Sequence, residues 1–290
     1  MDLDDGLGEN RVVEARPLTG LASDLSRAKR FQWLSSHTVN EAPGDGPIRA
    51  SSGYDSARMS WVPPDGFFER ADSTPDTEFY SWPRFVTHID AAAITAVGDL
   101  YEELKIEGEV LDLMSSWVSH FRRPPTRLTV LGMNFAELSA NPQAAVSVVH
   151  DLNADPRLPF PDHTFDAVVC CVSIDYLTRP VELFADVARV LRPGAPFVCT
   201  FSNRCFPTKA IKGWLYSDDN ERCSIVAGYF RSSGSWDPPS IERRTLPTHA
   251  GDQLFAVWAN RSGVQSTRCG AATHLTAHPR STSGGSGLSV

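Results

Sequence analysis

Three side chains in this sequence are candidates for moving a proton: His88, Asp175 and Tyr176. Asp175 and Tyr176 follow a strongly apolar run (165–172), whereas His88 stands in PRFVTHID (83–90), just before an amphipathic stretch. An imidazole, a carboxylate or a phenolate can take a proton from a nucleophile when a reaction requires it. We therefore expect these residues to be catalytic, with a hydrogen bond at the start of a helix as the alternative role of His88.

The cysteines and histidines give no sign of a metal site. None of the six cysteines belongs to a CxxC pair, and the eight histidines form no HExxH motif. CxxC and HExxH are the spacings typical of zinc ligands. Cys170, Cys171 and Cys199 lie inside apolar, strand-like runs. We interpret them as buried thiols in a reducing compartment, and we predict a cytoplasmic protein without a bound metal.

The elements that must position these residues follow from apolar spacing and its interruptions. Amphipathic stretches predict helices over 90–104, over 181–191 and around 225–230, the last ending at Gly234. Short apolar runs predict seven strands, at 110–113, 128–133, 146–149, 165–172, 197–201, 241–246 and 254–259.

Strands that alternate with helices predict a mostly parallel sheet with helices on both faces. The last two strands are joined only by PTHAGD (247–252), which is too short for a helical crossover, so we expect them to pair antiparallel. Ligands of such sheets bind at the carboxyl ends of the parallel strands. One site should therefore be surrounded by the residues that follow 113, 134, 151, 173 and 201.

Four motifs stand in a familiar order: EVLDL (109–113), VLGMN (130–134), VVHDLNADPRLPFPDHTFDAVVCCVS (148–173) and DVARVLRPGAPFVCTFSN (186–203). Together they resemble class I S-adenosylmethionine-dependent methyltransferases, in particular the branch called methyltransferase type 11. The resemblance covers about residues 84–262. It implies a doubly wound, Rossmann-like α/β fold, with a seven-stranded, mostly parallel sheet, an antiparallel C-terminal strand and helices on both faces.

The resemblance also implies which residues bind S-adenosyl-L-methionine. Asp112 matches the acidic residue that ends the family's first strand, and Asp151 matches the residue beside the adenine. Asn134 stands where the family has a carboxylate for the ribose hydroxyls, so it lacks the strength of a charged acceptor. The set assigned to the cofactor is Asp112, Met114, Ser115, Ser116, Trp117, Met133, Asn134, Asp151, Leu152, Asn153 and Ser173.

The chain departs from the family at the cofactor loop, which is poor in glycine. In LMSSWVSH (113–120) the family's glycines are replaced by Met114, Ser116 and Val118. Glycine at such positions allows a positive φ and a close approach of the backbone to a ligand. Two prolines (124–125) follow so soon that we expect the first helix to be truncated.

The overall composition excludes several classes of protein. Lys and Arg number 27 against 35 Asp and Glu, a net charge of −8, whereas a nucleic-acid surface usually needs a basic patch. The longest apolar runs span six residues, far short of the roughly 20 that a membrane-spanning helix needs. The expected partner is a small-molecule acceptor, with no nucleic acid and no membrane, and the oligomeric state stays open.

We predict three regions along the chain. Residues 1–75 form a poorly ordered or wrapping arm with a short helix at 27–34, residues 76–262 a methyltransferase-like domain, and residues 263–290 a disordered tail. The expected function is S-adenosylmethionine-dependent methyl transfer to a small-molecule acceptor. The alternative is a catalytically inactive methyltransferase-like binding or scaffold protein. A Rossmann dehydrogenase is disfavoured because GxGxxG is missing after the first strand.

Overall fold

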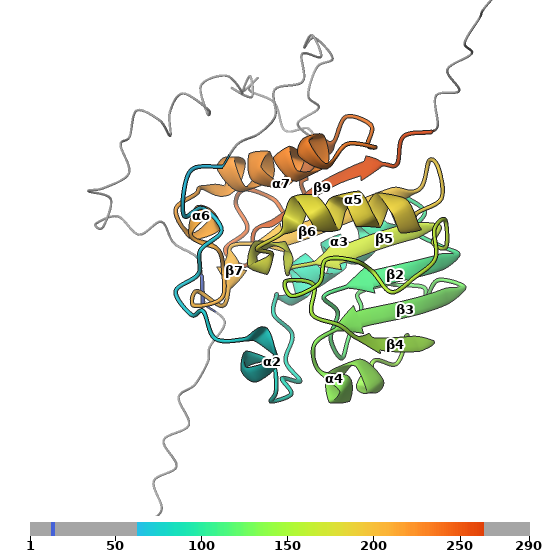
Figure 1. The fold of residues 1–290 in the computed structure, drawn as a ribbon, viewed down its shortest axis with the longest axis horizontal. Coiled ribbons are helices and arrows are strands. Elements are labelled where there is room, and N and C mark those ends of the chain that lie inside the picture. Colours follow the sequence, from blue (N-terminus) through green and yellow to red (C-terminus); the bar gives the residue numbers. More distant parts are fainter. Residues whose placement is uncertain (1–12, 15–62, 264–290) are drawn as a thin grey trace, which may run out of the picture.

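The structure, a computed structural model, describes residues 13–14 and 63–263. Most of the predicted arm (1–75), including its short helix, and all but the first residue of the predicted tail (263–290) lie outside these ranges. The described residues form a seven-stranded sheet with helices on both faces and a separate two-stranded sheet, and the segment from 63 onward runs past the carboxyl ends of the strands of the larger sheet (Figure 1).

Seven strands form the central sheet: β2 (Glu109–Leu113), β3 (Arg127–Gly132), β4 (Val146–Val149), β5 (Ala167–Cys171), β6 (Pro196–Ser202), β8 (Ser240–Arg243) and β9 (Leu254–Asn260). Their spatial order is β4-β3-β2-β5-β6-β9-β8. The strands from β4 to β6 are parallel, and β9 runs antiparallel to both of its neighbours. This arrangement confirms the predicted doubly wound sheet and places its switch point between β2 and β5.

The middle strands are buried on both faces, as their unbroken apolar sequences require. Side chains alternate along a strand, so Leu111 and Val110 of β2 belong to the cores of opposite faces. The Leu111 face is covered by α5 (Pro180–Val190) and α7 (Asp219–Ser233), and the Val110 face by α3 (Ala91–Glu103). Helices thus cover both faces, as the sequence predicts.

The ends of the long helices are set by local capping groups. Asp90 caps α3, and Pro180 occupies the first turn of α5. Asp218 and Glu221 form a capping box that starts α7 earlier than the predicted helix, and α7 ends at Gly234, whose φ is +72°.

Two crossovers of the sheet contain no helix. Residues 114–126, between β2 and β3, and residues 150–166, between β4 and β5, run as loops and turns. The two prolines led us to expect a truncated helix between β2 and β3, and the structure has no helix there. The β3–β4 crossover holds only α4 (Phe135–Ala140), which the sequence analysis does not predict. Loops therefore surround much of the carboxyl edge of this half of the sheet.

The segment 63–90 is anchored to the domain by a buried ion cluster. The Lys209 side chain is fully buried, and its Nζ lies 3.3 Å from the Asp72 carboxylate and 3.2 Å from that of Asp76. Because buried charges are stable only when paired, this cluster fixes α2 (Asp76–Phe79) near the sheet. The remaining short elements are β1 (Val13–Glu14), its antiparallel partner β7 (Arg204–Cys205), α6 (Lys212–Leu215) and the 3₁₀ turn η1 (Ile174–Tyr176).

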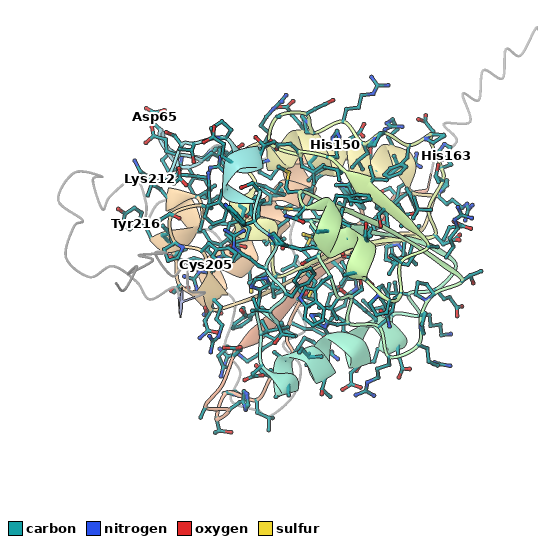
Figure 2. The ribbon with its side chains drawn as sticks, turned by 90° about the horizontal axis from the view of Figure 1, so that it is seen from below. Asp65, His150, His163, Cys205, Lys212 and Tyr216 are labelled. Atoms are coloured by element: carbon teal, nitrogen blue, oxygen red, sulfur yellow. The ribbon has the colours of Figure 1, made fainter. Side chains whose placement is uncertain are left out.

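Five cysteines lie among the described residues, and all are free thiols. Cys170 and Cys199 are fully buried, as predicted, and Cys171 is partly buried. In the part of the chain that the structure describes, no helix is long and apolar enough to cross a membrane, and no His, Cys, Asp and Glu side chains gather as metal ligands. His150 and His163, for example, lie at separate places (Figure 2).

Candidate functional site

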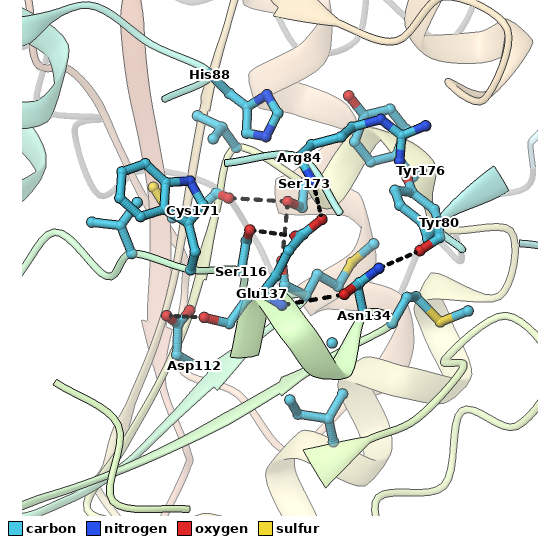
Figure 3. A pocket seen from close by; sticks show the side chains of 18 of the residues that line it. Tyr80, Arg84, His88, Asp112, Ser116, Asn134, Glu137, Cys171, Ser173 and Tyr176 are labelled. Atoms are coloured by element: carbon cyan, nitrogen blue, oxygen red, sulfur yellow. Dashed lines mark hydrogen bonds between the residues drawn. The ribbon is translucent and has the colours of Figure 1, made fainter. Parts of the chain in front are cut away.

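A pocket opens at the carboxyl ends of β2, β3, β4 and β5, beside residues 80–88 (Figure 3). The empty space within it, open solvent included, measures about 1230 Å³. Every residue that the resemblance assigns to the cofactor lines it, as do His88 and Tyr176. The fold therefore gathers residues that are scattered between 88 and 176 of the chain.

Asp112 lies buried at the end of β2. The hydroxyls of Ser115 and Ser119 donate to one of its carboxylate oxygens, at 2.7 and 2.6 Å. Burial raises the pKa of Asp112 to about 6, against the opposing effect of the two hydroxyls. A cation nearby would favour the ionised carboxylate, so Asp112 is suited to a positively charged group of a ligand.

The loop after β2 has a left-handed residue and a close backbone approach, although it contains no glycine. Met114 has a φ of +53°, a left-handed conformation that costs roughly 1–2 kcal/mol for a residue with a β-carbon. The Ser115 N–H donates to the Leu131 carbonyl at 2.8 Å. The Ser115 carbonyl lies so close to Gly132 that a β-carbon at Gly132 would overlap it. The close approach thus depends on a glycine in the facing strand.

A second strained residue borders the pocket at the end of β5. Val172 has a φ of +46°, which is rare for a β-branched residue. Next to it, the Ser173 hydroxyl donates to the Cys171 carbonyl at 3.1 Å. Strained residues therefore flank the switch point on both sides, at β2 and at β5, and such strain concentrates at functional sites.

Trp117 forms a wall of the pocket. Its indole N–H donates to the Val86 carbonyl at 3.0 Å, and the Phe85 ring packs edge-on against it with the ring centroids 6.3 Å apart. These contacts join the loop after β2 to the segment 80–88, so this side of the pocket is closed by side-chain packing.

Asn134 lines the pocket, but its side chain is fully engaged elsewhere. Its Oδ1 accepts from the N–H groups of Ala136 and Glu137 and so caps α4. Its Nδ2 donates to the carbonyls of Tyr80 and Ser81, at 2.9 and 3.2 Å. A primary amide has two acceptor and two donor positions, and all four are used. In this structure Asn134 thus tethers the segment 80–88, and its expected role at the ribose stays a prediction.

Glu137, which the sequence analysis misses, brings a carboxylate to the same place. It stands in the first turn of α4 and is buried. Its two oxygens accept from the Ser116 hydroxyl at 2.5 Å and from the Arg84 N–H at 2.7 Å (Figure 3). The spacing of Asn134 and Glu137 is that of a helix cap followed by an acidic residue at the third position, and this signal could have revealed both roles.

The residues after β4 are also partly engaged. One oxygen of Asp151 accepts from the N–H groups of Asn153 and Ala154, so it caps a turn, while Asp151 still borders the pocket. The Asn153 amide donates to the Asp76 carboxylate at 2.8 Å and to the Tyr176 carbonyl at 3.0 Å. Asn153 thus connects α2 to η1, and its expected role as a cofactor ligand stays a prediction.

Of the three predicted catalytic residues, Asp175 and Tyr176 have their polar groups buried. Asp175 does not line the pocket, and burial raises its pKa to about 8. Successive side chains of a 3₁₀ turn point about 120° apart, so Asp175 and Tyr176 face different surroundings. The Tyr176 hydroxyl accepts from the Phe206 N–H at 2.8 Å, and burial raises its pKa well above the ordinary value. These surroundings favour His88 over Asp175 and Tyr176 as the base, and the roles expected of the latter two stay predictions.

His88 keeps the properties of a base. It lines the pocket, and its ring lies edge-on to Phe206, with the ring centroids 5.5 Å apart. Burial, and then the nearby Arg84 charge, lower the pKa of His88. The imidazole is therefore neutral at pH 7 and able to accept a proton. By contrast, the Cys171 thiol at the pocket wall is not a nucleophile, because burial raises its pKa to about 12.

A family model and several solved structures resemble this chain. Residues 115–199 match the model of a methyltransferase domain, whereas no curated protein gives a significant match. Geranyl diphosphate C-methyltransferase from Streptomyces coelicolor A3(2) is 14% identical, with a TM-score of 0.40 over 58% of this chain and 77% of that one. An S-adenosylmethionine-dependent methyltransferase from Mesorhizobium loti is 15% identical, with a TM-score of 0.40 over 57% and 98% of the two chains. The cyclase SpnF is 13% identical, with a TM-score of 0.43 over 59% and 82%.

The matched segment contains most of the loop after β2, α4 and the end of β5, which form one part of the pocket lining. The sheet is mostly parallel with an antiparallel strand near its C-terminal edge, as the resemblance implies. Residues 115–199 are thus similar to a methyltransferase domain, and they lie in a sheet of the kind expected from the resemblance to class I S-adenosylmethionine-dependent methyltransferases.

Proposed function

We propose that this pocket binds S-adenosylmethionine and that the protein transfers its methyl group to a small-molecule acceptor. One observation carries the proposal. The residues that the family pattern assigns to the cofactor line a single pocket at the switch point of the sheet, where ligands of doubly wound folds bind.

The acidic side chains of the pocket fit a cofactor that carries an ammonium group, a sulfonium group and a ribose. Asp112 is suited to a cationic group because its ionised form gains from one. In this proposal the carboxylate of Glu137, and not the amide of Asn134, binds the ribose hydroxyls. A ribose hydroxyl would take over the hydrogen bond that the Ser116 hydroxyl now donates to Glu137, so that the buried carboxylate stays satisfied.

Bound S-adenosylmethionine supplies a methyl carbon that its sulfonium has already activated. The protein's own residues then have to position the acceptor, exclude water and take up a proton. Trp117 and Val86 close one side of the pocket. His88 receives the proton of a protic acceptor, and Asn134 holds the segment that carries His88.

Calorimetric titration with S-adenosylmethionine and S-adenosylhomocysteine tests the cofactor. We expect micromolar dissociation constants and, at 100 times the dissociation constant, a stabilisation against unfolding of about 2.7 kcal/mol. Glu137→Gln should weaken both ligands about tenfold, because a charged acceptor is lost. The control Glu182→Gln alters an exposed carboxylate that pairs with Arg179 and should change nothing. If neither ligand binds the wild-type protein at millimolar concentration, the proposal is wrong.

A catalytically inactive binding protein is the second candidate. The observation that favours it is the engagement of Asn134 and Asn153, two family positions whose side chains hold the fold instead of facing a ligand. Formation of S-adenosylhomocysteine in the presence of acceptor candidates separates the two functions. An inactive protein would bind the cofactor with the same affinity and form none.

A further inference from the structure

Arg84 brings a positive charge to the pocket, and no carboxylate of residues 63–263 forms an ion pair with its side chain. Among residues 63–263 its side chain donates only to two backbone carbonyls, those of Phe79 at 2.9 Å and Trp82 at 3.2 Å, and it forms no ion pair. The neighbouring Arg70, in contrast, pairs with Asp76 at 2.8 Å. A partly buried guanidinium without a counter-ion is a ready partner for an anionic ligand, since it offers several donors in one plane.

Aromatic rings surround this charge. The guanidinium carbon of Arg84 lies 4.6 Å from the ring centroid of Phe79, 5.6 Å from that of Phe206 and 5.8 Å from that of Tyr80. The Tyr176 ring lies 6.0 Å from Phe206. Tyr80, Tyr176 and Phe206 all line the pocket, and we call them the aromatic wall. Such a wall favours a flat, unsaturated ligand.

The guanidinium and the candidate base flank the same part of the wall. His88 and Arg84 lie 5.5 and 5.6 Å from the Phe206 ring, and both line the pocket (Figure 3). A ligand placed against the aromatic wall would therefore have a cation and a neutral imidazole within reach. A compound with an acidic group and a protic group on a flat ring would satisfy both.

We propose that the methyl acceptor is an aromatic carboxylic acid whose carboxylate pairs with Arg84 and whose ring lies against the aromatic wall. This inference rests on the proposed function, and it adds the class of the acceptor. The charge argument also fits the cofactor, because an anionic acceptor is attracted to a sulfonium whereas a cationic acceptor is repelled. The carboxylate of the cofactor itself is the other anion that could pair with Arg84.

The test measures binding of probe compounds to the protein saturated with S-adenosylhomocysteine. The probes are benzoate, 4-hydroxybenzoate and 4-hydroxycinnamate, each with its neutral amide, and hexanoate as an acid without a ring. We expect at least one aromatic acid to bind about tenfold or more tightly than its amide and than hexanoate. Arg84→Gln should remove this preference and leave the amides unchanged. The control Arg123→Gln removes an exposed arginine that pairs with Glu102 and should keep the preference.

Three outcomes would overturn the inference. The first is that no acid binds the wild-type protein more tightly than its amide, a result that does not depend on whether any variant folds. The second is that the preference for acids survives Arg84→Gln. The third is that Arg84→Gln weakens S-adenosylhomocysteine tenfold but not 5′-methylthioadenosine, which lacks the amino-acid part, because Arg84 would then hold the cofactor. Failure of the wild-type protein to bind S-adenosylhomocysteine would instead refute the proposed function.

Discussion

The half of the sheet formed by β5, β6 and β9 is covered by two long helices, whereas the half formed by β2, β3 and β4 meets loops and the six-residue α4 at its carboxyl edge. In the first half, Phe184 of α5 packs against the rings of Phe197, Tyr229 and Phe230, all fully buried. The second half holds the buried carboxylates Asp112 and Glu137 instead.

This difference indicates that one half of the sheet mainly stabilises the fold and that the other half mainly forms the binding site. Apolar packing between helices and sheet stabilises the fold, at about 25 cal/mol for each Å² of apolar surface buried. Buried carboxylates and left-handed residues such as Met114 cost stability. Such costs are tolerated at a site because the rest of the domain offsets them.

The largest expected effect is a loss of stability without a loss of affinity. Phe184→Ala leaves a cavity between α5, α7 and the sheet, so the free energy of unfolding should fall by about 3–5 kcal/mol. Phe184 does not line the pocket, and the folded fraction should bind S-adenosylmethionine with unchanged affinity. Urea unfolding and calorimetry measure the two quantities. A tenfold loss of affinity would show that the two halves are coupled.

Asp112→Asn should have the reverse effect. The folded-state pKa of Asp112, about 6, lies above its ordinary value of 3.8. Its favourable contribution is therefore present at low pH and is lost as pH rises through about 6, a loss of about 3 kcal/mol. Above that pH the variant should be more stable than the wild type by up to this amount, yet bind the cofactor more weakly. Urea unfolding as a function of pH checks this.

The control for this variant is Asp237→Asn, which changes an exposed carboxylate bonded to the Ser262 hydroxyl. It should leave both the pH dependence and the affinity unchanged. An Asp112→Asn protein that loses stability at high pH would contradict the idea that this carboxylate is kept at a cost to the fold.

Gly132→Ala should affect both quantities. The added β-carbon would overlap the Ser115 carbonyl, so the loop after β2 must move, at a cost of about 1–3 kcal/mol. Cofactor affinity should fall as well, because the displaced loop lines the pocket. Gly263→Ala is the matched control, since a β-carbon there meets no neighbouring atom. Normal affinity in Gly132→Ala would mean that the close approach serves only folding.

The smallest effect concerns two left-handed residues with the same φ of +53°, Met114 at the pocket and Lys105 after α3. Lys105 is exposed, so Lys105→Gly should stabilise the protein by about 0.5–1 kcal/mol. Met114→Gly should gain less, because the Met114 side chain packs against the core, and it should change the affinity. Equal gains without a change in affinity would show that Met114 has no part in binding.

The sequence predicts the sheet and the long helices because their signals are local. Apolar spacing marks the strands, and Asp90, Pro180 and Gly234 mark helix ends within a few residues of the elements that they cap. The gathering of Asp112, Asp151 and Ser173 in one pocket also follows, since the ends of parallel strands meet at one edge of a sheet.

The roles of individual polar side chains are less predictable because they depend on distant partners. Asn134 bonds to Tyr80, 54 residues away, and Asn153 bonds to Asp76, 77 residues away. A position in a family motif does not reveal such partners. Asp175 differs again, since the direction of its side chain depends on a 3₁₀ turn that the apolar pattern does not indicate.

The indole of Trp117 is an intrinsic fluorescent probe of the pocket. Its N–H bond to the Val86 carbonyl is one of the contacts that join the segment 80–88 to the loop after β2. Movement of that segment to admit a ligand would hydrate the indole and shift its emission to longer wavelength. The chain has seven tryptophans, and the difference between wild type and Trp117→Phe isolates this signal. Rapid mixing with S-adenosylhomocysteine would then time the opening of the pocket without an added label.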